Sequence, residues 1–171
     1  MFLLALFCDI RFATYVDINM YKPMSTMKGP SFETTILVRD SCLCLHVQRA
    51  ARALARRFDD ALRPLGLTNG QFSLLMSLNR PEPPPIAPVA RLLAMDRTTL
   101  TAALKPLERR GLVEISPDPA DRRSRRLSLT AAGRKLLAAA VPIWRANHRT
   151  VERELRVGKA DELRAMLRAI G

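Results

Sequence analysis

The chain has 171 residues, of which 48% are apolar and 26% charged, a balance that is typical of globular proteins and excludes wholesale disorder and collagen-like repeats. Its longest apolar runs, at 1–8 and 136–144, reach about half of the ~18 residues that a membrane-spanning helix needs, so we expect no integral membrane protein. A formal net charge of +12, from 28 Lys and Arg against 16 Asp and Glu, favours a polyanionic partner, either nucleic acid or an anionic membrane surface.

Residues 1–40 contribute nothing to this surplus, because they hold four basic and four acidic residues. They show no sustained helical or strand period and include Pro23, Gly29 and Pro30, which predicts a loosely ordered arm or a translation start assigned too far upstream. An arm that extends a dimer interface is the alternative. The apolar start has no preceding Lys or Arg and is followed at once by Asp9, which argues against a secretion signal. With only three cysteines in the chain, we expect a protein of the reducing cytoplasm.

After this arm, apolar residues recur every three or four positions, as in an amphipathic helix. The stripe consists of Leu43, Val47, Ala50, Leu54, Phe58 and Leu62. Pro64 and Gly66 end this helix, and the spacing of Thr68 and Gln71 is that of a capping box, which predicts a second helix. Its expected apolar face is Phe72, Leu75, Met76 and Leu78. The prolines of 81–85 then predict a stiff, extended connector.

The stretch 86–111 predicts two helices joined by a tight turn. Pro88 suits the first turn of the short first helix. The expected buried residues of that helix are Val89, Leu92 and Leu93. Asp96 is a good N-cap for the second helix, 97–110, in which Pro106 predicts a kink. The expected buried residues of the second helix are Leu100, Leu104 and Leu107.

Two short strands are expected next, at 112–116 and 125–129, on either side of a charged turn. Thr130 can cap a long helix in which Pro142 predicts a kink, and a further amphipathic helix follows. These elements are too few to bury every apolar stripe within one subunit. We therefore expect the first helix and the last two helices to pack against a second copy of the chain.

The expected outer face of the 97–110 helix carries hydroxyl, methyl and cationic groups. It consists of Arg97, Thr98, Thr101, Ala102, Lys105 and Arg109. Thr hydroxyls bind phosphates or base edges, a methyl group contacts thymine, and Arg pairs with guanine. The hairpin tip, with Arg122 and Arg123, suits insertion into a minor groove. A solvated helix can carry the same residue types, so this face alone does not establish DNA binding.

Three motifs occupy most of the stretch 92–133. They are Leu92-Leu93-Ala94-Met95-Asp96-Arg97-Thr98-Thr99-Leu100-Thr101, then Leu107-Glu108-Arg109-Arg110-Gly111-Leu112-Val113, and Asp118-Pro119-Ala120-Asp121-Arg122-Arg123 leading to Leu127-Ser128-Leu129-Thr130-Ala131-Ala132-Gly133. With them, residues 41–171 resemble the MarR family of winged-helix transcriptional regulators; the third motif is similar to the family's Asp-x-Arg wing and Leu-Thr-x-x-Gly. The resemblance implies a mainly α fold with a small two-stranded β-wing, a winged helix-turn-helix lobe at 68–130, and dimerisation helices at 41–64 and 131–171.

By this likeness we expect a homodimer that binds a near-palindromic, double-stranded DNA operator and acts as a repressor. The DNA-binding residues that the resemblance implies are Arg97, Thr98, Thr99, Thr101, Ala102, Lys105, Asp121, Arg122, Arg123 and Arg125. Among them, Asp121 would orient the wing and Arg123 would enter the minor groove.

Two kinds of signal fit this family, a small ligand held between the dimerisation helices and the DNA-binding lobe, or an oxidant. Cys42 and Cys44 lie at the expected start of the first helix, where the helix dipole favours a thiolate, and His46 follows Cys42 by one turn. This placement resembles that of the reactive cysteine in the peroxide-sensing branch of the family. Cysteines on an apolar helix also serve as core filler, so a small aromatic or phenolic effector is the competing hypothesis.

Other chemistry has little support in the sequence. With two histidines, no Cys-x-x-Cys and no Gly-rich phosphate loop, we expect no cofactor, no metal and no enzymatic activity. A metal site built from Cys42, Cys44, His46 and His148 would require two distant helices to meet. The alternative function is a basic helical module for RNA or an anionic membrane surface. Such a module needs its basic residues along one continuous helix face, whereas we expect them to concentrate at the hairpin tip and the 97–110 helix.

Overall fold

The computed structural model describes residues 29–119, 121, 124–155 and 158–170. The chain divides into two compact units, residues 1–42 and 43–171. The described part of the first unit contains a helix, α1 (Phe32–Ser41), which the sequence pattern did not predict. Three of its apolar residues, at 36–38, are consecutive rather than spaced by three or four, so periodicity could not reveal this helix. The expectation for residues 1–28 lies outside the described residues.

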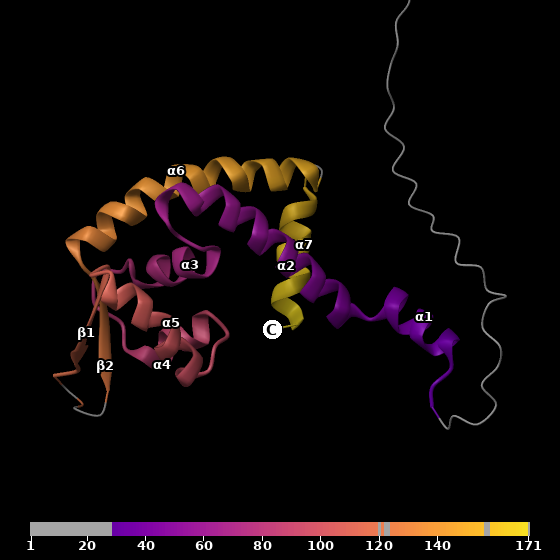
Figure 1. The fold of residues 1–171 in the computed structure, drawn as a ribbon, viewed down its shortest axis with the longest axis horizontal. Helices are drawn as coiled ribbons and strands as arrows, with labels where there is room; N and C mark the ends of the chain where they lie inside the picture. The colour runs from indigo at the N-terminus through magenta and orange to yellow at the C-terminus, as the bar shows by residue number, and fades with distance from the viewer. Residues whose placement is uncertain (1–28, 120, 122–123, 156–157, 171) are drawn as a thin grey trace, which may run out of the picture. The chain divides into compact units, whose positions relative to one another are not determined.

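The second unit is mainly helical and carries a two-stranded antiparallel sheet (Figure 1), which confirms the expected fold class. Its elements are α2 (Leu43–Leu62), the 3-10 turn η2 (Arg63–Leu65), α3 (Asn69–Leu78), α4 (Ile86–Leu92), α5 (Arg97–Arg109), β1 (Val113–Pro117), β2 (Arg125–Leu129), α6 (Ala131–Glu154) and α7 (Lys159–Ile170). The predicted capping box at the start of α3 is confirmed. Thr68 Oγ1 accepts a hydrogen bond from the Gln71 amide, and Gln71 Oε1 accepts one from the Thr68 amide, both at 3.2 Å.

Both internal prolines lie within continuous helices. α5 continues through Pro106 to Arg109, and α6 continues through Pro142 to Glu154. A proline removes only its own amide donor, so one carbonyl in each helix loses its partner, and in α5 that carbonyl belongs to the exposed residue Ala102. The prolines at which we expected kinks therefore end neither helix.

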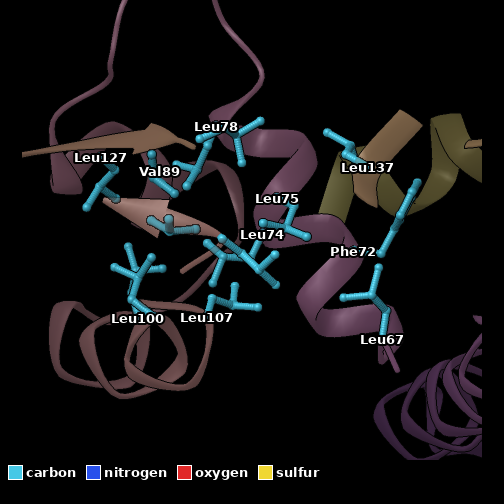
Figure 2. Close-up of a cluster of buried hydrophobic side chains, with 14 of the residues drawn as sticks. Leu67, Phe72, Leu74, Leu75, Leu78, Val89, Leu100, Leu107, Leu127 and Leu137 are labelled. Atoms are coloured by element: carbon cyan, nitrogen blue, oxygen red, sulfur yellow. The ribbon is translucent and has the colours of Figure 1, made fainter. Parts of the chain in front are cut away.

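A cluster of buried apolar side chains, mostly leucines, from α3, α4, α5 and the wing forms the core of this unit (Figure 2). The predicted inner face of α5 is fully buried and consists of Leu100, Leu104 and Leu107. Two side chains that were predicted to be buried are not, since Met76 is 40% exposed and Leu92 is 60% exposed. Leu74 and Ala90 occupy core positions instead. The reason is tertiary, because α3 contacts both α6 and β2 and α4 contacts both α5 and β2, and these partners cover other sides of the two helices.

The proline connector pairs with the wing, which the sequence did not predict. The Leu127 amide donates to the Pro84 carbonyl at 3.0 Å, and Arg126 Nη1 donates to the Pro83 carbonyl at 3.1 Å. An isolated β-bridge joins Pro85 to Arg126. Proline lacks an amide donor but keeps its carbonyl acceptor, so the connector can hydrogen-bond to β2 and fix the base of the wing.

Thr130 and Gly133 join the start of α6 to the residues that follow α5. The Thr130 amide donates to the Leu112 carbonyl at 3.1 Å, and its hydroxyl donates to the Gly111 carbonyl at 2.6 Å. The same hydroxyl accepts a hydrogen bond from the Gly133 amide at 3.0 Å, which caps α6. A Cβ at Gly133 would lie 2.0 Å from the Leu112 carbonyl oxygen. The Leu-Thr-x-x-Gly sequence is therefore a junction between the wing, the end of α5 and the long helix.

Replacing Gly133 with alanine should lower the free energy of unfolding by at least about 1–3 kcal/mol, the usual cost of overpacking, because the atom that its Cβ meets is backbone. The matched control is Gly70→Ala in α3, where the nearest atom to a new Cβ is 4.0 Å away. The control should be neutral or slightly stabilising. Urea unfolding followed by circular dichroism measures both, and equal midpoints would contradict a tight contact at Leu112.

Candidate nucleic-acid interface

α5 is held next to α4 by a tight turn and by an N-cap. The Met95 amide donates to the Ala90 carbonyl at 2.9 Å, and Ala94 has a φ of 51°, in the left-handed region. Asp96 then caps α5 by accepting hydrogen bonds from the Thr99 hydroxyl at 2.6 Å and the Thr99 amide at 2.8 Å. These bonds, the hydroxyl's first, hold the pKa of Asp96 below its ordinary value because they stabilise the carboxylate.

The outer face of α5 is open to solvent. The exposed residues are those predicted from the sequence, namely Arg97, Thr98, Thr101, Ala102, Lys105 and Arg109. Within the described chain, the cationic groups of Arg97 and Lys105 have no hydrogen bond or ion pair. Their charges are therefore available to an external partner.

The threonines of this face differ in what their hydroxyls can do. The Thr99 hydroxyl donates to Asp96, and the Thr101 hydroxyl donates to the Arg97 carbonyl at 2.7 Å. Each hydroxyl has one proton, so in this arrangement the protons of these two threonines are engaged within the protein and their oxygens are left to act as acceptors. Thr98 has no such internal bond in the described chain and can donate as well. The sequence could not predict this distinction, which depends on side-chain rotamers.

The wing contains an ion pair between a buried carboxylate and a half-buried arginine that sequence reasoning missed. The Asp118 side chain is only 8% exposed, and its Oδ2 lies 3.1 Å from Arg126 Nε. Asp121, which we expected to orient the wing, is exposed, and its carbonyl accepts from the Ser124 amide at 2.8 Å. Only the register of the ladder brings the Asp118–Arg126 pair together, and residue spacing does not give that register.

Of the other predicted wing residues, the structure describes only Arg125. Arg125 is exposed at the start of β2. Arg122 and Arg123 lie outside the described residues, so their expected roles stay predictions.

Basic residues are not confined to α5 and the wing, which corrects the expectation that they concentrate there. Exposed basic residues also follow the outer faces of α2 and α6. They are Arg49, Arg52, Arg56, Arg134, Lys135, Arg145, Arg149 and Arg153. In this respect the fold has the continuous basic helix faces that the alternative function requires.

A mostly apolar cavity of about 450 Å³ lies between α3, the end of α4 and α6. Phe72 and Trp144 both line it, and their rings are stacked on each other with centroids 6.1 Å apart. Met76 and Leu92, which were predicted to be buried and are exposed, also line the cavity, and Arg145 supplies a cation. An apolar space with one charged group is typical of a small-molecule site.

The four residues of the hypothetical metal site belong to three different elements. Cys42 is partly buried at the C-cap of α1, whereas Cys44 is exposed in the first turn of α2, where its sulfur accepts from Gln48 Nε2 at 3.2 Å. His46 lies on α2, and His148 on α6 is stacked on Trp144. Among the described residues, no three His, Cys, Asp or Glu side chains form a group that could hold a metal ion. None of the described helices combines the length and the apolar character that crossing a membrane requires.

Comparison with known proteins identifies transcriptional regulators. A sequence model of the MarR family matches residues 67–124. Over 79 residues the chain is 38% identical to the HTH-type transcriptional repressor NicR of Pseudomonas putida and 43% identical to the transcriptional regulator HosA of Escherichia coli O111:H-. These matches cover 46% and 45% of this chain and 50% and 57% of the relatives. The chain thus spans about half the length of these curated relatives.

Solved structures match over more of the chain. The Mycobacterium tuberculosis regulator MosR in complex with DNA is 38% identical, with a TM-score of 0.70 over 76% of this chain and 93% of that one. The repressor CouR bound to a 23-mer DNA duplex is 30% identical, with a TM-score of 0.63 over 78% of this chain and 92% of that one.

The cap of α5 predicts a pH dependence. Because the folded state lowers the pKa of Asp96, its carboxylate stabilises the fold above the ordinary value of 3.8, and this stabilisation is lost as the pH falls through the lowered pKa. Asp96→Asn keeps a capping oxygen but cannot titrate. The melting temperature of the wild type, followed by circular dichroism, should therefore exceed that of the variant at neutral pH, and the difference should shrink below pH 3.8. A difference that is constant with pH would contradict the cap.

Proposed function

The chain belongs to the MarR family of transcriptional regulators, and we propose that it is a repressor that binds a near-palindromic, double-stranded DNA operator as a homodimer. The observation that carries this proposal is the outer face of α5, where Arg97, Thr98 and Lys105 are exposed beside the wing. The family consists of DNA-binding regulators without enzymatic activity. A chromosomal operator implies that the protein works in the cytoplasm.

The hydroxyl geometry of α5 suggests how this helix reads bases. Arg97 can pair bidentately with guanine in the major groove, and Lys105 can reach a phosphate. In the structure the protons of Thr99 and Thr101 are used within the protein, which leaves their hydroxyl oxygens to act as acceptors. They can accept from the exocyclic amino groups of adenine or cytosine. By the family resemblance, Arg123 at the wing tip enters the minor groove.

Exposed apolar residues on α2 and α7 support the homodimer. They are Leu43, Val47 and Leu54 on α2 and Leu163, Met166, Leu167 and Ile170 on α7. α7 buries none of its residues within the chain, although Arg164 ties it to Glu152 of α6 at 2.9 Å. A helix with this much exposed apolar surface is stabilised by a partner. A two-fold dimer would present two copies of α5 to successive major grooves.

The cavity beside Trp144 supports modulation by a small aromatic or phenolic effector. Its apolar walls accept a ring and Arg145 can pair with an anionic group. The far side of Trp144 stacks on His148 with centroids 4.7 Å apart, and His148 Nε2 lies 3.2 Å from Glu152 Oε1. Since Arg164 of α7 binds the same carboxylate oxygen, a ligand that moves Trp144 has a direct route to the proposed dimer interface.

Thiol oxidation is the second candidate signal. The observation that favours it is the exposed thiol of Cys44 in the first turn of α2, where an oxidant can reach the sulfur. Oxidation there would add bulk and polarity at the start of a helix that we assign to the dimer interface.

Removing Arg97 tests the DNA proposal. Arg97→Ala should weaken binding by about 1–3 kcal/mol if the side chain pairs bidentately with a base, and the loss should concentrate at one position of each half-site. Arg168→Ala on α7 is the control for lost charge. Affinity for duplex DNA, single-stranded RNA and anionic vesicles is measured across a salt series. Tighter binding to RNA or vesicles than to duplex DNA would favour the alternative, a basic helical module.

An acidic residue on the apolar side of α7 tests the dimer. Met166→Glu should produce a folded monomer in analytical ultracentrifugation, because this side chain is 59% exposed in the single chain and a carboxylate cannot remain buried against a partner without a large cost. Ala165→Glu, on the opposite side of the same helix, should stay dimeric. A Met166→Glu protein that still sediments as a dimer would exclude this face from the interface.

The single tryptophan of the chain reports on the cavity directly. Benzoate should quench Trp144 fluorescence and weaken DNA binding, whereas Arg145→Gln should lose the benzoate response and keep a response to neutral phenol, since only the anion needs the guanidinium. Arg149→Gln, one turn further along α6, is the control. If neither compound quenches, but peroxide releases DNA and Cys44→Ser prevents this, thiol oxidation replaces the ligand hypothesis.

A further inference from the structure

Three arginines form a line on the side of α2 that faces away from the core. They are Arg49, Arg52 and Arg56. Intervals of three and four residues place them on one side of the helix, whereas Phe58 and Leu62 are buried. All three are exposed, and together with His46 they line a groove of about 610 Å³. Because seven residues of helix rise by about 10 Å, the three guanidinium groups form a positive strip of that length, which we call the α2 arginine surface.

No carboxylate neutralises the α2 arginine surface within the described chain. Its arginines form no ion pair there, and Arg52 donates to the neutral side chain of Gln48 at 3.3 Å. The next arginine along the helix behaves differently, since Arg57 pairs with Glu154 through two hydrogen bonds of 2.5 and 2.8 Å. Like charges three or four residues apart destabilise a helix, so this surface would be stabilised by an anionic partner.

A second copy of the chain is a poor source of that anion, because the carboxylates of α6 and α7 are already paired. The pairs are Glu152 and Asp161 with Arg164, Glu154 with Arg57, and Glu162 with Lys159. If one of these carboxylates paired with the α2 arginine surface instead, its present arginine or lysine partner would lose its ion pair. The carboxylates of the helices that we assign to the dimer interface are therefore already engaged, and we take the anion that the surface fits to be external to the protein.

The chemistry of the surface favours nucleic acid over a membrane. Its groove is otherwise lined by Ala50 and Ala53, whereas a helix that binds a membrane presents large apolar residues to the lipid. A guanidinium binds phosphate oxygens bidentately. Duplex DNA carries one charge per ~1.7 Å of its axis, so a strip of about 10 Å can meet several phosphates.

We propose that the α2 arginine surface is a second DNA contact, which binds phosphate groups outside the base pairs that α5 reads. The proposal builds on the proposed DNA-binding function but concerns an element with no part in reading the operator. The phosphates can belong to the flanks of the bound duplex or to a second duplex. In both cases the contact adds affinity and salt dependence without sequence preference.

The test replaces all three arginines of the surface with glutamine, which keeps the helix propensity and removes the charge. Binding to random-sequence duplexes of about 20 and about 60 base pairs is measured across a salt series. The slope of log K against log salt should fall by about 0.9 for each lost phosphate contact, so by up to roughly 3 per chain. The matched control removes three arginines elsewhere, by Arg39→Gln, Arg63→Gln and Arg168→Gln. In the structure Arg39 pairs with Asp40 and Arg63 with Asp60. The salt slope of this control should change far less.

Two arms identify the source of the phosphates. A loss of affinity confined to the longer duplex assigns them to flanking DNA. In the second arm, protein bound to an immobilised duplex is tested for capture of a labelled duplex. If the variant loses this capture, the phosphates belong to a second duplex. Circular dichroism and sedimentation establish that the variant is folded and has the wild-type oligomeric state.

Four results would overturn the proposal. They are an unchanged slope, an equal loss in the control, a change of oligomeric state that makes the surface an interface between copies, and lost binding to phosphatidylglycerol vesicles with DNA binding intact. If the wild type itself binds no duplex, the proposed function fails first. A wild type that binds DNA with the same slope as the triple variant leaves the proposed function standing and removes only the second contact.

Discussion

The close approach of Gly133 to the backbone of Leu112 is the contact on which the other parts of the second unit depend. It leaves no room for a Cβ, since that atom would lie 2.0 Å from the Leu112 carbonyl oxygen. Thr130 reinforces it by bonding to Gly111 and Leu112 and capping α6 at the same time. One backbone junction therefore joins the end of α5, the wing and the start of α6, so the proposed DNA-reading elements are presented as one body.

From this junction α6 links the proposed DNA-reading elements to the rest of the chain. Its first half meets the junction, its middle forms a wall of the cavity with Trp144, and its end holds α7 through Glu152 and Arg164. The stacked rings of Trp144 and His148 lie between the cavity and that last pair. A single helix thus connects three places where the proposed DNA, effector and second subunit would bind, and this gives a physical route for regulation.

Elements governed by local chemistry could be predicted from the sequence, and those governed by tertiary contacts could not. The cap at Asp96 and the buried face of α5 follow from residue type and a period near 3.6, and both are present in the structure. The Asp118–Arg126 pair depends on strand register. Met76 and Leu92 were predicted to be buried, because their spacing fits an apolar face, yet they line a cavity. Whether an apolar side chain fills the core or borders a cavity depends on how neighbouring helices pack.

The central claim is that two copies of α5, related by a two-fold axis, read one DNA duplex. A binding selection on random duplex DNA with the full chain, followed by sequencing, tests it most directly. A two-fold dimer should enrich an inverted repeat whose half-site centres lie about one helical turn, roughly 10 base pairs, apart. A motif that is enriched to full affinity as a single asymmetric site, or the absence of any enriched motif, would contradict it.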